Sequence, residues 1–93
     1  MQRILLVEDE MLNMAVLSEY LRQAGYQIDE AADGIIAWDK LLKNKDYALV
    51  VTDRNMPNMT GLELFNQMKT RSEFRHINST LRNTWWVTSQ YNV

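Results

Sequence analysis

The stretch Ala48–Leu64, which reads ALVVTDRNMPNMTGLEL, constrains the fold of this chain more than any other part of the sequence. It opens with a short, unbroken apolar run at Ala48–Val51, which is typical of a strand buried on both faces. Asp53 follows at the carboxyl end of that strand, the edge at which open α/β sheets bind their ligands. A turn containing Pro57 comes next. Apolar residues then recur at helical spacing, at Leu62, Leu64, Phe65 and Met68. This order of strand, acid, turn and helix predicts a ligand site at a sheet edge.

A second apolar run also ends in acids, because residues 4–10 read ILLVEDE. The carboxyl ends of parallel strands meet at one edge of a sheet, so we expect Glu8 and Asp9 to gather with Asp53 in one crevice. Like charges held so close disfavour joint ionisation. A hard divalent cation resolves that conflict, and Mg²⁺ typically uses one or two carboxylates together with waters and phosphate oxygens. Glu10 is the weaker candidate, since an acid there also suits the start of a helix.

The chain before the central run alternates between helix and strand patterns. Apolar residues first recur at helical spacing, at Met14, Leu17, Leu21 and Ala24. Gly25 follows where a left-handed C-terminal cap is expected. Gln27–Ala31 alternates as a half-exposed strand does, Asp33-Gly34 predicts a turn, and a second helical pattern begins near Ile36. The order βαβαβα implies an α/β fold with a parallel sheet and right-handed crossovers.

These features together resemble the receiver domain of two-component response regulators. The match covers about residues 3–71 and rests on the Glu8-Asp9 pair, Asp53, the Asn55-Met56-Pro57 turn and Gly61. The resemblance implies a flavodoxin-like, doubly wound parallel sheet with strand order 2-1-3-4-5, in which the first and third strands are neighbours. It also implies that Asp53 accepts a phosphoryl group. The implied ligands of Mg²⁺, with Mn²⁺ as an alternative, are Glu8, Asp9, Asp53 and the backbone carbonyl of Asn55.

The resemblance further implies a signalling role. The phosphoryl donor would be a phosphohistidine on a sensor histidine kinase or a phosphotransfer protein, and the chain would be no enzyme beyond its own phosphorylation and dephosphorylation. The main alternative is a non-phosphorylated receiver fragment that acts as an interaction module. A third interpretation, a metal-dependent phosphatase with Asp53 as transient nucleophile, lacks a general acid two residues on, where Asn55 stands.

Residues 72–93 depart from the family pattern. They contain no Gly and no Pro, nine of the 22 are Ser, Thr or Asn, and no lysine follows Lys69. A complete receiver has a Thr or Ser at the end of its fourth strand and a lysine at the end of its fifth. We therefore expect the N-terminal part of a receiver over residues 1–71, truncated after the third βα unit, followed by a non-matching tail.

Two interpretations of the tail remain open. One is a short strand at residues 84–89. The other is a helical stripe formed by Phe74, Ile77, Leu81 and Trp85. If the tail supplies no strand, the Ala48–Val51 run becomes a sheet edge with unpaired backbone groups, and we expect self-association through that edge.

Length and composition indicate one small domain of an ordinary globular kind. The 93 residues include no cysteine, no apolar run of membrane-spanning length and no signal-peptide pattern, so we expect a cytoplasmic protein with no membrane contact. Residues 1–53 hold ten acids and five bases, whereas residues 54–93 hold two acids and five bases. Those later bases are scattered, which argues against nucleic-acid binding. His76, the single histidine, lies outside the matching region and is not expected to react.

Overall fold

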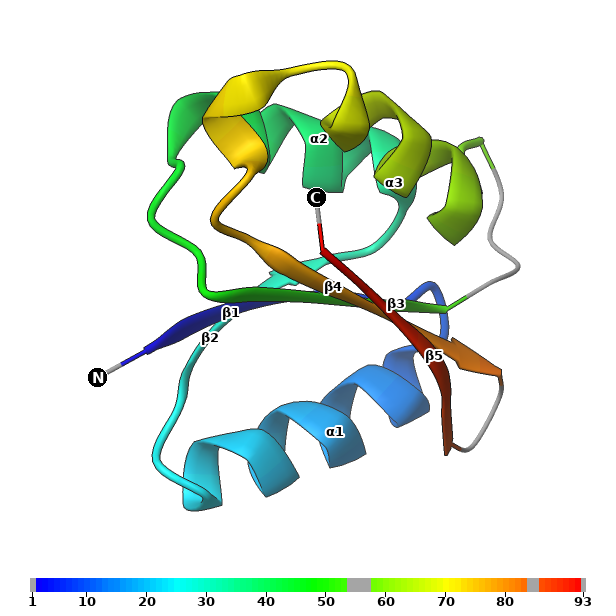
Figure 1. Ribbon diagram of the computed structural model, residues 1–93. Helices are drawn as coiled ribbons and strands as arrows, with labels where there is room; N and C mark the ends of the chain where they lie inside the picture. The colour runs from blue at the N-terminus through cyan, green and yellow to red at the C-terminus, as the bar shows by residue number, and fades with distance from the viewer. Residues whose placement is uncertain (1, 54–57, 84–85, 93) are drawn as a thin grey trace.

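The structure is a computed structural model that describes residues 2–53, 58–83 and 86–92. Strands and helices alternate through its first two thirds, as the sequence predicts. The elements are β1 (Arg3–Val7), α1 (Met11–Gln23), β2 (Gln27–Ala31), α2 (Gly34–Lys43), β3 (Leu49–Asp53), α3 (Gly61–Lys69), the short 3₁₀ turn η1 (Ser72–Phe74), β4 (Asn78–Asn83) and β5 (Trp86–Asn92). Figure 1 shows α1 on one face of the sheet and α2 with α3 on the other.

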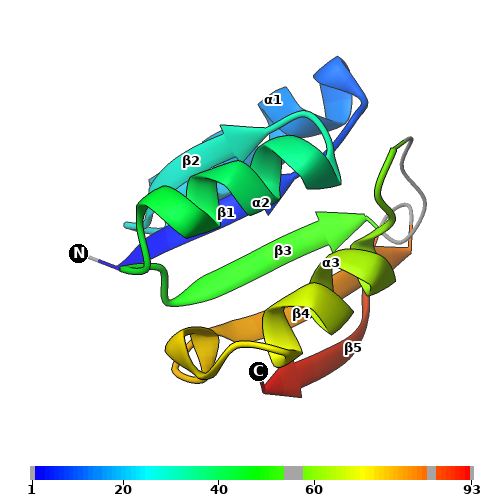
Figure 2. The ribbon, with the colours of Figure 1, turned by 90° about the horizontal axis from the view of Figure 1, so that it is seen from above.

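All five strands form one sheet with the order β2-β1-β3-β4-β5. The first four strands are parallel, whereas β5 pairs with β4 in the antiparallel direction. Figure 2 shows the arrows of β1 to β4 pointing the same way, so the carboxyl ends of the adjacent strands β1 and β3 lie at one edge. The predicted α/β, flavodoxin-like, doubly wound sheet is therefore confirmed.

The central strands are apolar runs because both of their faces are covered. On the face of α2 and α3, Leu5 and Val50 belong to the larger core cluster, which also includes Leu64, Phe65 and Met68 of α3. On the opposite face, Leu6 and Val51 belong to a smaller cluster. Met14, Leu17 and Leu21 of α1 pack against this second cluster, as their helical spacing predicts. The prediction that the Ala48–Val51 run is buried on both faces is confirmed, since Val50 is fully buried and Val51 is only 9% exposed.

The helix ends are set by local sequence signals. Gly25, at φ +98°, takes the left-handed conformation just after α1, which the sequence also predicts. Asp33 caps the start of α2, where its carboxylate accepts a hydrogen bond of 2.8 Å from the Ile36 N–H. Thr60 caps α3 in the same manner and forms a reciprocal capping box with Glu63. A glycine therefore follows the end of α1, and capping side chains set the starts of α2 and α3.

The tail differs from the sequence expectation. Residues 78–83, rather than 84–89, form the strand beside β3, and the Cα pairing runs from Leu49 with Asn78 to Asp53 with Arg82. The helical stripe is wrong for Leu81, because this residue lies within the strand Asn78–Asn83. Phe74 and Ile77 are instead buried in the larger core cluster. Trp85 lies outside the described residues, and residues 86–89 fall within β5.

A fourth parallel strand completes the pairing of β3. Among the described residues η1, β4 and β5 follow the third βα unit, and no helix follows β4. In addition, β3 is paired on both sides, so the condition for self-association through its edge is not met. The physical reason is that an apolar central strand gains backbone hydrogen bonds from any extended neighbour, and the polar segment Asn78–Asn83 supplies them.

Candidate metal centre

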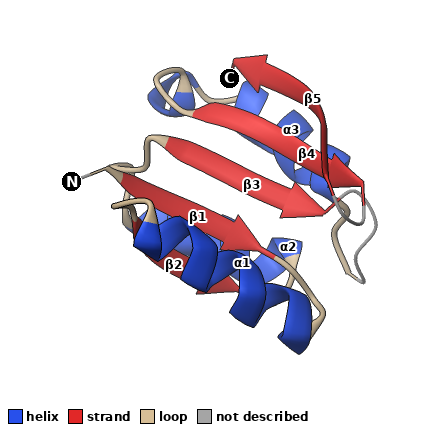
Figure 3. Cartoon of the chain, turned by 90° about the horizontal axis from the view of Figure 1, so that it is seen from below, coloured by secondary structure: helices blue, strands red, loops and turns tan. Residues whose placement is uncertain are grey.

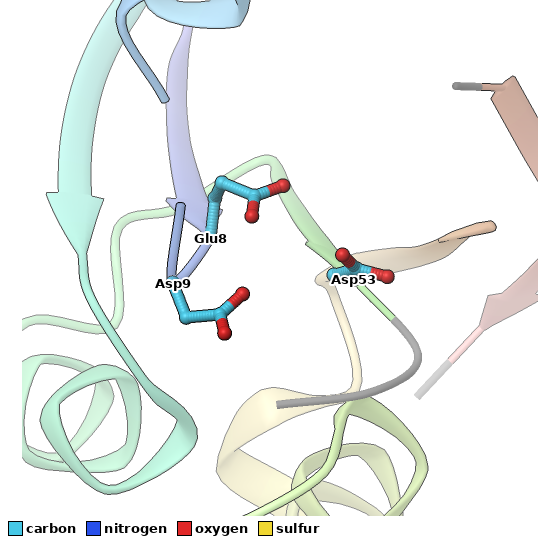
Figure 4. A group of neighbouring side chains, drawn as sticks. All are labelled: Glu8, Asp9 and Asp53. Carbon is cyan, nitrogen blue, oxygen red and sulfur yellow. The ribbon is translucent and has the colours of Figure 1, made fainter. Parts of the chain in front are cut away.

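Three carboxylates converge at the edge where β1 and β3 end. Glu8 and Asp9 directly follow β1, and Asp53 is the last residue of β3. One oxygen from each side chain lies within 4.8 Å of the others. Figure 4 shows Glu8 and Asp9 reaching from the end of β1 toward Asp53. The predicted gathering of these three acids is present.

Backbone hydrogen bonds hold Glu8, the most buried of the three acids, in place. Glu8 is only 2% exposed, Asp53 is half-buried and Asp9 is exposed. The Glu8 N–H donates to the carbonyl of Ala31 at 3.0 Å, and a carboxylate oxygen of Glu8 accepts from the Glu10 N–H at 2.9 Å. These bonds tie the end of β1 to β2 and to the entry of α1. Glu10 itself is the N-cap residue of α1 and does not belong to the cluster.

The donor set fits a hard divalent cation. Three carboxylates so close together repel one another, and the burial of Glu8 strengthens the repulsion because water screens it less. Carboxylate oxygens are the ligands that Mg²⁺ and similar ions prefer. Within the described ranges this is the one group of three or more acid, histidine or cysteine side chains arranged to share an ion.

The sequence also predicts Asn55 to be a metal ligand and His76 to be a residue outside the site. Asn55, with Arg54, Met56 and Pro57, lies outside the described residues. His76 is exposed and lies before the amino end of β4, at the sheet edge opposite the acids. Its Nε2 is 2.6 Å from the carbonyl oxygen of Lys45, so this nitrogen carries the proton and donates it. His76 therefore takes no part in the acidic cluster.

One contact near the site was not predicted from the sequence. Asp33 and Gly34, which the sequence marks only as a turn, meet the chain that follows β3 at Asn58 and Met59. The Asn58 amide donates to the second carboxylate oxygen of Asp33 at 3.0 Å. The Ile36 N–H, and to a lesser degree this amide, hold the pKa of Asp33 below its usual value despite some desolvation. No local pattern encodes this contact, because its partners are 25 residues apart.

Comparison with known proteins defines the class of this protein. The family model of the response regulator receiver domain matches residues 4–85. The chain therefore belongs to the response regulator receiver domain family, as the resemblance indicates. The match extends beyond Arg71 and includes β4, in agreement with the structure rather than with the shorter range given by the motifs.

Individual relatives include a chemotaxis protein and response regulators. The chemotaxis protein CheY1 of Helicobacter pylori is 36% identical over 76 residues, which cover 81% of this chain and 61% of CheY1. The chain thus spans about three fifths of the length of this curated relative. The response regulator TrrA from Thermotoga maritima, solved in complex with Mg²⁺-BeF, is 33% identical with a TM-score of 0.75 and covers 87% of this chain and 66% of the solved chain.

The chain is also similar to a chain in the crystal structure of the histidine kinase ThkA in complex with TrrA. It gives a TM-score of 0.81 at 32% identity and covers 92% of this chain and 72% of the matched chain.

In the described part of this chain, every helix is too short or too polar to cross a lipid bilayer.

Proposed function

We propose that this chain is a phosphoacceptor module of two-component signalling, in which Asp53 receives the phosphoryl group. The observation that carries the proposal is the cluster of Glu8, Asp9 and Asp53, whose oxygens lie within 4.8 Å of one another at the carboxyl edge of β1 and β3. Membership of the receiver family supports the same assignment. These three side chains would hold Mg²⁺, or Mn²⁺ in its place, and the backbone carbonyl of Asn55 is the fourth protein ligand that the resemblance suggests.

The chemistry is an in-line displacement at phosphorus. A carboxylate oxygen of Asp53 attacks the phosphorus atom, the P–N bond of a phosphohistidine donor breaks, and the leaving imidazole takes up a proton. Such a transfer needs mainly positioning and neutralisation of charge. When bound, the cation would offset the negative charge of the carboxylates and of the phosphoryl oxygens. The backbone bonds that hold Glu8 prepare this end of the sheet in advance.

The donor that we propose is a sensor histidine kinase or a phosphotransfer protein. The solved complex of TrrA with the kinase ThkA supports this choice, since TrrA shares the fold and a third of the sequence of this chain. The chain would catalyse at most its own phosphorylation and dephosphorylation. Action in the cytoplasm stays a prediction.

The test is labelling with a small phosphodonor. Incubation with acetyl phosphate and Mg²⁺ should give an adduct on Asp53 that is stable in acid and labile to base and hydroxylamine. Asp53→Asn should abolish it, whereas Asp39→Asn, at an exposed carboxylate of α2, should leave it unchanged. We expect slow labelling, because no lysine follows Lys69 and the loss of one charge-stabilising donor typically costs about 2.7–4 kcal/mol in the transition state. Label on His76 or on a Ser or Thr of the tail would contradict the proposal.

Metal binding is tested separately from labelling. Titration with Mg²⁺, followed by tryptophan and tyrosine fluorescence or by calorimetry, should show binding without phosphate. The double variant Asp9→Ala, Asp53→Ala removes two of the three carboxylates and should lose that binding. If this variant binds like the wild type, the assignment of the site is wrong.

A second candidate function is a non-phosphorylated interaction module. The observation that favours it is the antiparallel direction of β5, which departs from the all-parallel sheet that the resemblance implies. Because β5 is antiparallel to β4, its carboxyl end lies away from the sheet edge that carries the acids. Retained Mg²⁺ binding without any labelling of Asp53 would favour this second function.

A further inference from the structure

A residue with a positive charge is paired with Asp53 in the sheet. Strands β3 and β4 run parallel in one unbroken register, and the last pair of that register is Asp53 with Arg82. Neighbouring strands lie about 4.8 Å apart. Figure 2 shows the arrows of β3 and β4 pointing the same way, so both strands end at the edge where the acids gather. Arg82 therefore occupies the position beside the proposed phosphoacceptor on the adjacent strand.

The topology brings one of the two arginines of the tail to this edge. Residues 72–93 contain Arg75, Arg82 and no lysine. Arg75 is exposed and precedes β4, so it lies near the amino end of that strand, at the opposite edge of the sheet. Arg82 is followed in β4 only by Asn83. Of these two bases, Arg82 is therefore the one placed at the carboxyl edge.

The pairing on the other side of β4 changes at the same residue. Leu81 pairs with Ser89 of β5, whereas Arg82 pairs with Val87, so the register shifts between Leu81 and Arg82. Bulges of this kind interrupt a ladder and are frequent next to active sites. The irregular step in β4 thus falls at the residue beside Asp53, which supports a role for Arg82 at this edge.

The acidic cluster needs more positive charge once Asp53 carries a phosphoryl group. Glu8 and Asp9 contribute two carboxylates, and a phosphoryl group adds roughly 1.5–2 negative charges. A divalent cation offsets only part of this total, and water screens the remainder poorly because Glu8 is buried. An arginine guanidinium is always charged, and its parallel N–H donors match phosphoryl oxygens.

We infer that Arg82 is a catalytic residue for the phosphorylation of Asp53, whose guanidinium donates hydrogen bonds to the oxygens of the transferring phosphoryl group. The inference rests on the proposed function and deepens it. In the reaction with acetyl phosphate, a carboxylate oxygen of Asp53 forms a bond to phosphorus, the bond from phosphorus to the bridging oxygen breaks, and acetate leaves with the electron pair. Arg82 keeps its protons throughout and stabilises the charge on the phosphoryl oxygens.

A structural role and a catalytic role of Arg82 predict different changes in Mg²⁺ binding. If Arg82 only stabilised the sheet, its removal would disturb the acids and weaken both Mg²⁺ binding and labelling. If Arg82 acts on the phosphoryl group, its removal takes away a positive charge that repels the cation. Mg²⁺ binding then stays equal or tightens while labelling slows. Measuring both quantities on the same variants therefore separates the two roles.

The experiment measures the Mg²⁺ affinity and the initial rate of Asp53 labelling by acetyl phosphate, in wild type and in variants verified as folded by circular dichroism. We expect Arg82→Ala to slow labelling about 100-fold, the usual effect of removing one charge-stabilising donor, with a Mg²⁺ affinity no lower than that of the wild type. Arg82→Lys restores the charge and should recover most of the rate. If Arg82→Ala does not fold, Arg82→Gln takes its place, since glutamine keeps a long polar side chain without the charge.

Arg75→Ala is the matched control, because it removes an exposed arginine of the same tail at the opposite edge of the sheet. A distant, exposed charge is largely screened by salt, so both the affinity and the rate should stay within about twofold of the wild type.

The outcomes separate the two proposals. Labelling of Arg82→Ala at the wild-type rate overturns this inference and leaves the proposed function intact. A joint loss of Mg²⁺ affinity and labelling in Arg82→Ala also overturns it, because the role would then be structural. Equal slowing in Arg75→Ala, or no recovery in Arg82→Lys, overturns it as well. Absence of labelling on Asp53 in the wild type overturns both proposals.

Discussion

At the scale of single residues, Asp29 of β2 is held by two donors from distant parts of the chain. The hydroxyl of buried Tyr47 donates to its carboxylate at 2.6 Å, and the guanidinium of Arg3 donates to the same oxygen at 3.0 Å. Burial alone would raise the pKa of Asp29, but these two hydrogen bonds, together with the positive charges of Arg3 and Lys40, lower the pKa below its usual value of 3.8. Burial, followed by the bond to Asp29, raises the pKa of Tyr47. Asp29 is therefore ionised and Tyr47 neutral at pH 7, and their bond ties β2 to the chain entering β3.

Removing this hydroxyl tests the pair. Tyr47→Phe should lower the free energy of unfolding at pH 7 by about 1.5–3 kcal/mol, the range for a hydrogen bond to a charged group. Because the pKa of Asp29 is lower in the folded state, this stabilisation is present above pH 3.8 and is lost as the pH falls through the folded pKa. Urea unfolding between pH 7 and pH 3 should show the difference shrinking in acid. Tyr20→Phe, at a side chain that is 72% exposed, should change stability by less than about 0.5 kcal/mol. A difference that does not vary with pH would contradict the role of Asp29.

At the scale of elements, the capping box fixes where α3 begins. The Thr60 hydroxyl accepts from the Glu63 N–H at 3.2 Å, and the Glu63 carboxylate accepts from the Thr60 N–H at 3.0 Å, which lowers the pKa of Glu63. Thr60→Ala should therefore lower the free energy of unfolding by about 0.5–2 kcal/mol in chemical denaturation. Thr60→Ser keeps the hydroxyl and should remain near wild type. An equal loss in both variants would show that the methyl group, rather than the cap, stabilises the helix.

The elements also show how far the sequence predicts this structure. Gln27–Ala31 is a strand over the residues that its alternation indicates, and the acidic cluster forms because parallel strands that end in acids must bring those acids together. The residues NSTLRN of β4 carry no such pattern, since their strand conformation comes from pairing with β3 rather than from their own propensity. The sequence pattern does not predict the contact of Asp33 with Asn58 either, because this contact depends on how α2 packs beside the chain at Asn58.

At the scale of the whole molecule, the arrangement of helices follows from the order of the strands. The steps from β1 to β2 and from β2 to β3 run in opposite directions across the sheet, so right-handed connections place α1 on one face and α2 on the other. β5 turns back antiparallel to β4 and needs no crossover helix. Figure 3 shows that, among the described elements, no helix lies over β4 and β5 on the face of α1. Because β4 and β5 both come from the tail of the chain, β3 is a central strand only while the tail pairs beside it.

Truncation tests that dependence. A chain ending at Ile77 loses β4 and β5, so β3 becomes an edge strand with unpaired backbone groups and newly exposed apolar surface. A domain of this size has little stability in reserve, so we expect this chain to lose cooperative unfolding and to self-associate. A chain ending at Asn83 keeps β4 beside β3 and should remain folded, with a lower free energy of unfolding. Sedimentation gives the state of association, and native-state hydrogen exchange gives the protection of the amides of residues 49–52. A monodisperse monomer ending at Ile77 with strongly protected β3 amides would show that the tail is dispensable, because the first three strands would then form a stable sheet by themselves.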